Sequence, residues 1–291
     1  MDITTVITRP ATSLFVIAGP CVIESLDLCL EIGRHVKSVC DSLGLGYVFK
    51  ASFDKANRSS NASFRGPGLE GGVKILERVK AELGVPVLTD VHESSHPAKV
   101  APVVDLLQVP AFLARQTDLL HACGATGRAV NIKKGQFMAP GEMALAVQKV
   151  RAAQLDPQSA IRDPKSQDSA LGTQHSPILL TERGTFFGYG RLVNDFTGLA
   201  VMAQTHCPVV FDVTHSTQLP AGLGTTSGGH PEYSPLLARA AVAAGVQGLF
   251  LECHPDPKNA KSDAATMLGL TDVEPLLKAC ADIAKLRASW S

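Results

Sequence analysis

Basic side chains gather at the ends of apolar, strand-like stretches of the sequence or just beyond them. They are Lys50, Lys55, Arg58, Arg115, Lys133 and Arg183. Arginine presents a planar fork to phosphate or carboxylate, and lysine presents a compact positive charge. The chain as a whole is neutral, with 27 basic and 27 acidic residues. Cations concentrated at such positions predict anionic, phosphorylated substrates, although a solvated surface charge is the alternative for any single one.

A second group combines a thiol, an imidazole and two carboxylates: Cys21, His215, Glu252 and Asp263. Cys21 follows the apolar stretch 14–18 and a Gly-Pro pair, at which a strand ends. Thiolate, imidazole and carboxylate ligands together suit a divalent transition metal such as Zn, Fe, Mn or Co, and not Ca²⁺ or Mg²⁺. The alternative for Cys21 is a packed core side chain, which is the usual environment of a free cysteine.

Three residues near Glu252 bear on the choice of ligands. His254 and Asp256 are close enough in sequence to replace one of the four candidates. Cys253 is disfavoured, because successive side chains of a strand point to opposite faces. The residues alone therefore leave open both the ligand set and the presence of a metal.

The elements that must position these groups alternate between β-rich and amphipathic stretches. We expect strands at 14–18, 46–51, 86–90, 104–109, 129–133, 177–181, 208–213 and 247–252. We expect helices near 24–43, 69–83, 94–100, 115–123, 140–153, 192–204, 232–244 and 271–287. In the last helix the apolar side chains recur at helical spacing, and Thr271 with Glu274 predicts a capping box at its start.

Eight β-then-α units indicate an α/β fold, a (β/α)8 TIM barrel. An open doubly wound sheet is disfavoured by the number of β-then-α units, which is eight. We expect residues 1–291 to form a single domain, with a polar insertion at about 154–176 on the side away from the active-site face. Functional groups of such barrels come from the carboxyl ends of the strands. This rule adds Asp90 and Gln108, and barrel closure brings Cys21 beside His215 and Glu252.

Composition excludes several classes of function. No basic block supports nucleic-acid binding, and no apolar stretch is long enough to cross a bilayer or to act as a signal peptide. The seven cysteines are scattered and form no CxxC pair. We therefore expect a protein of the reducing cytoplasm that needs neither a membrane nor a nucleic acid as its partner.

Several ordered motifs carry a family likeness. They are FKASFDKANRSS, SFRGPGLEGG, TDVHE, LLQVPAFLARQTDLL, NIKKGQF, FDVTHSTQLP and FLECHPDPKNAKSDAA. Together they resemble the 3-deoxy-D-manno-octulosonate 8-phosphate synthases over about residues 14–270, except at the 154–176 insertion. The resemblance implies a (β/α)8 barrel, usually a homotetramer, that condenses phosphoenolpyruvate with D-arabinose 5-phosphate and water. Its product is a precursor of lipopolysaccharide in Gram-negative bacteria and of cell-wall polysaccharide in plants.

The resemblance also implies roles for individual residues. Metal-dependent members have cysteine at the first ligand position and metal-independent members have asparagine, so Cys21 implies a metal held also by His215, Glu252 and Asp263. Lys133, Arg183 and Arg115 would hold the phosphoenolpyruvate phosphate near the Ala111 backbone, and Lys50 and Lys55 would lie by its carboxylate and the reacting carbon. Asn57, Arg58 and Ser59 would bind arabinose 5-phosphate, and Asp90 a sugar hydroxyl.

Two other functions remain as alternatives. The DAHP synthases share the barrel and the Gly-Pro-Cys motif but use erythrose 4-phosphate, and they carry a Lys-Pro-Arg-Thr-Ser element. This chain has Lys-Ala-Asn-Arg-Ser-Ser at 55–60 instead, which favours the octulosonate enzymes. A barrel that binds phosphorylated sugars without turnover is the second alternative. The two complete sets of candidate residues argue against it.

Overall fold

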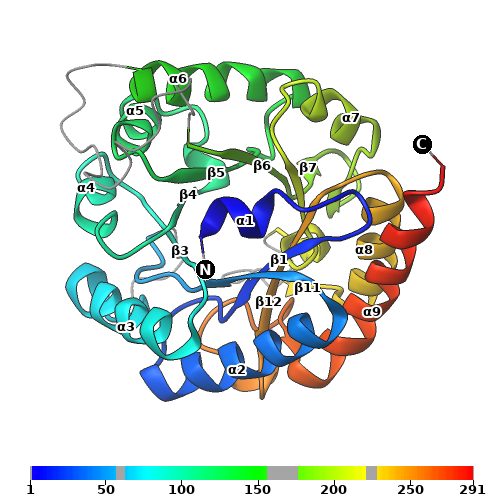
Figure 1. Ribbon diagram of the computed structural model, residues 1–291, viewed down its shortest axis with the longest axis horizontal. Coiled ribbons are helices and arrows are strands. Elements are labelled where there is room, and N and C mark those ends of the chain that lie inside the picture. Colours follow the sequence, from blue (N-terminus) through cyan, green and yellow to red (C-terminus); the bar gives the residue numbers. More distant parts are fainter. Residues whose placement is uncertain (1, 57–62, 156–175, 221–227, 291) are drawn as a thin grey trace.

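Eight parallel strands close into a barrel in the computed structural model, which describes residues 2–56, 63–155, 176–220 and 228–290 (Figure 1). Pairing of Phe15 with Gly248 closes the barrel between the first and last of these strands. The strands are β1 (Phe15–Gly19), β2 (Gly46–Lys50), β3 (Val87–Asp90), β4 (Leu106–Val109), β5 (Ala129–Lys133), β6 (Ile178–Glu182), β9 (Val209–Asp212) and β12 (Gly248–His254). All eight predicted strands and the (β/α)8 barrel are confirmed.

Helices surround the barrel on its outer face (Figure 1). They are α2 (Leu26–Leu43), α3 (Gly68–Leu83), α4 (His96–Val100), α5 (Thr117–Ala125), α6 (Met143–Leu155), α7 (Thr197–Ala203), α8 (Ser234–Ala243) and α9 (Leu270–Arg287). Each corresponds to a predicted helix. The N-terminal helix α1 (Ile3–Ile7) was not predicted, because one short turn has no detectable apolar period.

Two details of the predicted helices are wrong. The helix expected at 192–204 begins only at Thr197, because Leu192 and Val193 form strand β8. The capping box at Thr271 is absent: α9 begins one residue earlier, its N-cap is Gly269, and no side chain caps it.

Short elements extend the loops between strands and helices. The hairpin strands are β7 (Thr185–Phe186) with β8 (Leu192–Val193) and β10 (Gln218–Leu219) with β11 (Gly228–Gly229), and β13 (Leu268–Gly269) pairs with β12. The 3₁₀ turns are η1 (Ala111–Leu113), η2 (Pro140–Glu142), η4 (His215–Thr217), η5 (Pro231–Tyr233) and η6 (Pro257–Asn259). No helix in the described part of the chain has the length and apolarity to cross a bilayer.

The expected insertion at 154–176 lies mostly outside the described residues. Its described ends meet where α6 leads into β6: the Gln154 side-chain amide donates a hydrogen bond to the Ser176 carbonyl oxygen at 3.1 Å. The segment therefore leaves and re-enters the fold before the amino end of β6, at the barrel end opposite the carboxyl ends of the strands.

The apolar core has two parts. One lies between the barrel and its helices, and the other fills the barrel interior. Val6 and Ile7 of α1 belong to the interior part and pack with Phe15 and Val48 near the beginnings of β1 and β2. Helix α1 therefore closes the amino-terminal end of the barrel and leaves the carboxyl-terminal end for a site.

Candidate active site

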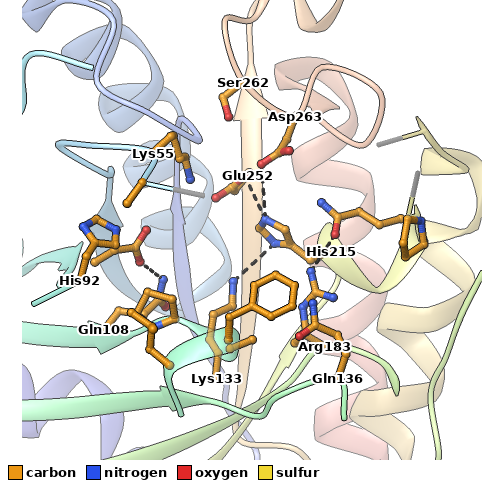
Figure 2. A pocket seen from close by; sticks show the side chains of 18 of the residues that line it. Lys55, His92, Gln108, Lys133, Gln136, Arg183, His215, Glu252, Ser262 and Asp263 are labelled. Atoms are coloured by element: carbon orange, nitrogen blue, oxygen red, sulfur yellow. Dashed lines mark hydrogen bonds and ion pairs between the residues drawn. The ribbon is translucent and has the colours of Figure 1, made fainter. Parts of the chain in front are cut away.

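The carboxyl ends of the strands surround a cavity of about 880 Å³ (Figure 2). Barrel enzymes place their active sites at this end. The predicted site residues among those lining the cavity are Lys50, Lys55, Asp90, Gln108, Ala111, Lys133, Arg183, His215, Glu252 and Asp263. They come from β2, β3, β4, β5, β6, β9, β12 and the loops that follow these strands.

Strand alternation explains how the barrel interior changes from apolar to polar. Leu88 of β3 packs in the apolar interior, and Asp90, two residues later, faces the cavity. The same two-residue step joins Val48 to Lys50, Leu106 to Gln108, Ala129 to Asn131, Leu179 to Thr181, Val210 to Asp212 and Phe250 to Glu252. Because side chains repeat with period two along a strand, the barrel acquires a polar layer directly above its apolar layer.

In β1 the position of this polar layer is occupied by Gly19. A Cβ atom there would lie 2.0 Å from the backbone oxygen of Lys50 on the neighbouring strand. The close approach of β1 and β2 therefore requires glycine, and the first chemically reactive side chain of this segment is Cys21, two residues later.

The thiol, imidazole and carboxylate group identified in the sequence is brought together in space. Cys21 Sγ lies 3.0 Å from Asp263 Oδ2 and 3.0 Å from Ser262 Oγ. One ligand atom each from Cys21, Glu252 and Asp263 lie within 4.8 Å of one another. His215 Nε2 is 3.6 Å from Glu252 Oε2 and 3.8 Å from Asp263 Oδ2 (Figure 2).

The charges around this cluster are strongly coupled. Lys50 Nζ pairs with Glu252 Oε1 and donates a hydrogen bond to the Cys21 carbonyl oxygen at 2.8 Å. Burial would raise the pKa of Glu252, but Lys50 and His215 lower it to about 2. Burial, followed by the carboxylates of Asp263 and Glu252, raises the pKa of the Cys21 thiol well above its usual value. Only an added positive charge would favour the Cys21 thiolate here.

Asp212 orients the imidazole of His215. Asp212 Oδ2 lies 2.8 Å from His215 Nδ1 and 2.7 Å from Lys133 Nζ. Burial opposes ionisation of His215, yet the Asp212 carboxylate raises the pKa of this imidazole. Because Nδ1 is occupied by Asp212, Nε2 is the nitrogen that faces Glu252 and Asp263. A carboxylate behind an imidazole is the usual partner of a metal-binding histidine.

The donor set fits a divalent transition metal. It combines a thiol, an imidazole nitrogen with its partner carboxylate behind it, and two carboxylates. Glu252 Oε2 is buried and has no hydrogen-bond partner among the described residues, and it faces His215 Nε2. A bound cation would satisfy this oxygen. The competing candidates lie elsewhere: Cys253 packs in the core between barrel and helices, and His254 faces Glu24.

Cations dominate the rest of the cavity. Burial would lower the pKa of Lys55, but Cys21, Glu252 and the nearby aspartates raise it well above its usual value. Arg183 Nη2 donates a hydrogen bond to Gln218 Oε1 at 2.7 Å, and its buried Nη1 has no hydrogen-bond partner within the described chain. Figure 2 shows Arg183 and Lys133 directed into the same cavity. These side chains are suited to bind an anionic group.

The side chains of Lys134 and Glu182, the sequence neighbours of Lys133 and Arg183, point away from the cavity. Lys134 Nζ lies 3.5 Å from Glu182 Oε2 and donates to Thr185 Oγ1 at 3.0 Å, and both members of this ion pair are buried. Neither lines the cavity. Lys133 and Arg183 therefore face the cavity. Their neighbours Lys134 and Glu182 connect the ends of β5 and β6 on the side of the barrel that faces the helices.

Asp90 forms the opposite wall of the cavity. Its Oδ2 accepts a hydrogen bond from Ser52 Oγ at 2.5 Å, and its Oδ1 accepts one from the Gln108 amide. Burial would raise the pKa of Asp90, but Lys50 and Lys55 hold it well below the usual range. Asp90 is thus an ionised acceptor beside the cationic part of the site.

Not every predicted site residue lines the cavity. Arg115 is exposed and lines a separate depression of about 350 Å³, whose other lining residues belong mainly to α5, η2 and α6. Within this single chain its side chain is not directed at the cavity. Asn57, Arg58 and Ser59 lie outside the described residues.

The cavity also contains residues that the sequence analysis did not select. They include His92, Gln136, Gln218 and Ser262. His92, Gln136 and Gln218 occur within the TDVHE, NIKKGQF and FDVTHSTQLP motifs, so the motifs held a signal. Ser262 precedes Asp263 directly. The β10–β11 hairpin presents Gln218 to Arg183.

Comparisons with known proteins agree with this architecture. The model of the DAHP synthetase I family matches residues 4–288. Proteins named 2-dehydro-3-deoxyphosphooctonate aldolase are similar along most of the chain. That of Polaromonas naphthalenivorans (strain CJ2) is 52% identical over 264 residues, which is 91% of this chain and 88% of the relative. That of Xylella fastidiosa (strain M12) is 52% identical over 270 residues, 93% of this chain and 91% of the relative. On the match to nearly its whole length, the chain belongs to the DAHP synthetase I family.

Proposed function

We propose that the protein is an enzyme that condenses phosphoenolpyruvate with D-arabinose 5-phosphate and water. The products are 3-deoxy-D-manno-octulosonate 8-phosphate and inorganic phosphate. The relatives at 52% identity carry the name of this activity. The observation that carries the proposal is the single cavity in which Lys50, Lys55, Lys133 and Arg183 lie beside the cluster of Cys21, His215, Glu252 and Asp263.

The positively charged side chains of the cavity match the negative charges of the reacting molecules. Carbon 3 of phosphoenolpyruvate attacks the aldehyde carbon of the sugar, water adds to carbon 2, and phosphate then leaves with cleavage of its C–O bond. Every species on this path carries several negative charges, and preorganised cations stabilise them without rearrangement. Lys133 and Arg183 hold the phosphoenolpyruvate phosphate near Ala111, while Lys50 and Lys55 lie by its carboxylate and the reacting carbon. Gln108 also lines the cavity.

The sugar occupies the other part of the cavity. Asp90, an ionised acceptor, accepts a hydrogen bond from a sugar hydroxyl. Asn57, Arg58 and Ser59 bind arabinose 5-phosphate, with Arg58 on its phosphate, and Arg115 is assigned to the phosphoenolpyruvate phosphate. The roles of these four residues rest on the motif resemblance.

We place the enzyme in the metal-dependent class. Cys21, His215, Glu252 and Asp263 would hold a divalent Zn, Fe, Mn or Co ion, and Asp212 would orient His215. When bound, the ion supplies positive charge that orients an oxygen ligand or lowers the pKa of a water molecule. The protein itself holds the thiol, imidazole and carboxylate donors close together and surrounds them with positively charged side chains.

Three further parts of the proposal concern the whole molecule. We propose a homotetramer, as the motif resemblance implies, and a single domain over residues 1–291. We propose a cytoplasmic location because all seven cysteines are free and buried, as suits a reducing compartment.

A phosphate-release assay with alternative aldose phosphates tests the function. With phosphoenolpyruvate present, arabinose 5-phosphate should be the better substrate and erythrose 4-phosphate the poorer one. The opposite order would establish a DAHP synthase. Binding of both substrates by calorimetry with no phosphate release would establish a binding protein instead. The variant Lys133→Met removes one cavity charge and should lower kcat/KM for phosphoenolpyruvate. Lys285→Met removes an exposed charge on α9, far from the cavity lining, and serves as the matched control.

A further inference from the structure

A continuous chain of side-chain hydrogen bonds runs beneath the cavity and crosses four neighbouring strands. Thr181 Oγ1 of β6 donates to Asn131 Oδ1 of β5 at 2.7 Å, and Asn131 Nδ2 donates to Gln108 Oε1 of β4 at 2.8 Å. Gln108 Nε2 then donates to Asp90 Oδ1 of β3. Asn131 and Thr181 are fully buried, and neither lines the cavity.

Strand register holds the central members of this chain in one row. Asp90 is paired with Gln108 across β3 and β4, and Gln108 with Asn131 across β4 and β5. Side chains directly opposite one another on adjacent strands are close enough to interact. The row is therefore a consequence of the barrel geometry and does not depend on flexible loops.

Every bond in the chain points in the same direction. The ionised carboxylate of Asp90 can only accept, so the Gln108 amide turns its NH₂ group toward Asp90. Gln108 Oε1 then accepts from the Asn131 NH₂ group, and this leaves Asn131 Oδ1 to accept from the Thr181 hydroxyl. The series ends on a carboxylate, which accepts a second bond from Ser52 at 2.5 Å. Reversal of either amide would place two acceptors, or two donors, against one another.

We propose that Thr181 and Asn131 are positioning residues, which fix the Gln108 amide so that it donates to Asp90 and holds that carboxylate toward the substrates. They act at a distance: Thr181 has two side chains between itself and Asp90, and it touches no substrate. The step from Asp90 to the sugar rests on the proposed function. The directed hydrogen-bond chain itself does not.

A pair of threonine variants tests the proposal. Thr181→Val keeps the shape but removes the donor, and Thr181→Ser keeps the donor. Thr89→Val is the matched control, because Thr89 is a buried threonine on β3 whose Oγ1 has no hydrogen-bond partner in the described chain. We expect Thr181→Val to lower kcat/KM about tenfold, the effect of losing one buried hydrogen bond. Thr181→Ser and Thr89→Val should stay within about twofold, since neither loses a hydrogen bond.

A comparison of the two substrates separates positioning from a general structural effect. In the proposed function Asp90 contacts the sugar and not phosphoenolpyruvate, so Thr181→Val should raise the KM for arabinose 5-phosphate and leave the KM for phosphoenolpyruvate within about twofold. Equal losses for both substrates, together with a lower unfolding temperature, would overturn the proposal. So would kinetics for Thr181→Val equal to those of Thr181→Ser.

A measurement without substrate keeps this test independent of the proposed function. Urea unfolding of wild type, Thr181→Val, Asp90→Asn and the double variant gives a coupling free energy between the two positions. The directed hydrogen-bond series predicts a nonzero coupling free energy between Thr181 and Asp90 at neutral pH, where Asp90 is ionised. Zero coupling would refute the series even in an enzyme of the proposed activity. Strong coupling in a protein that does not release phosphate would instead refute the proposed function and still support the series of hydrogen bonds.

Discussion

Cys21 Sγ and Asp263 Oδ2 lie 3.0 Å apart, although 242 residues separate them in the sequence. They meet because β1 and β12 are neighbours at the closure of the barrel. In the protein alone, Ser262 and Asp263 surround a thiol whose pKa is raised by burial and by the two nearby carboxylates. A bound divalent cation would lower the pKa of the Cys21 thiol again, because it would neutralise the carboxylates and favour the thiolate.

Removal of the metal is the first test of the cluster. A chelator should abolish activity, and Mn²⁺, Co²⁺ or Zn²⁺ should restore part of it. Cys21→Ser should lower metal content in elemental analysis, because a hydroxyl is a much weaker ligand for soft metals than a thiolate. Cys280→Ser changes a buried thiol on α9 and should leave metal content unchanged. Full wild-type activity after exhaustive chelation would return Cys21 to the role of a core thiol.

Cys21→Asn should behave differently from Cys21→Ser. The motif resemblance assigns asparagine at this position to metal-independent enzymes. Because the cavity cations still supply most of the charge stabilisation, we expect measurable turnover that resists chelation. The measurement is phosphate release before and after treatment with a chelator. Inactivity of this variant in a folded protein would show that the surroundings of Cys21 require the metal.

Two arginine variants should separate the two anion sites. Arg183→Ala should raise the KM for phosphoenolpyruvate, whereas Arg58→Ala should weaken arabinose 5-phosphate binding and largely spare phosphoenolpyruvate. Each loses a charge-assisted bond worth about 1.5–3 kcal/mol, which is one to two decades in affinity. Separate titration of the two substrates by calorimetry measures both effects. Equal losses for both substrates in either variant would show that the sites are assigned wrongly.

Asp90 should make stability depend on pH in a defined direction. Its folded-state pKa is depressed by Lys50 and Lys55, against the effect of burial. Its ionisation therefore stabilises the fold above the unfolded-state pKa of about 3.9, and this contribution is lost as the pH falls below that value. In urea titrations the difference between wild type and Asp90→Asn should be largest near neutral pH and shrink in acid. A difference that grows as the pH falls would contradict the assignment.

Gly19 should tolerate no side chain. In Gly19→Ala the new Cβ would lie 2.0 Å from the Lys50 oxygen, so we expect destabilisation of about 1–3 kcal/mol together with reduced activity. Gly141→Ala is the control, since no atom lies within 4 Å of a Cβ built there. Its free energy of unfolding should change by no more than about 1 kcal/mol. Equal stability of the two variants in urea would show that β1 and β2 can separate.

The barrel and much of its site could be predicted because both follow from local patterns. The strand stretches are apolar enough to be recognised, and the rule that sites lie at carboxyl ends selects Asp90, Gln108 and Glu252 from the sequence. Asn131 and Thr181 lie on correctly predicted strands, yet the sequence does not select them. Buried amides and hydroxyls carry no charge, and although Asn131 begins the NIKKGQF motif, the role of these side chains follows only from cross-strand register.

Other features could not be derived from the sequence because they depend on loops or on weak signals. Arg115 follows a predicted strand, yet after the turn η1 (Ala111–Leu113) its side chain lines the separate depression of the single chain. Helix α1 is too short for its apolar pattern to be recognised, and its packing below Phe15 appears only in the folded barrel.

The buried pair of Lys134 and Glu182 has a consequence for how the sheet assembles. A shift of β6 by one residue relative to β5 would turn its side chains to the opposite face. Glu182 would then point into the cavity, and Lys134 would stay buried without its acidic partner. Desolvating an unpaired charge is costly, so this pair favours the native alignment of the two strands over the shifted one.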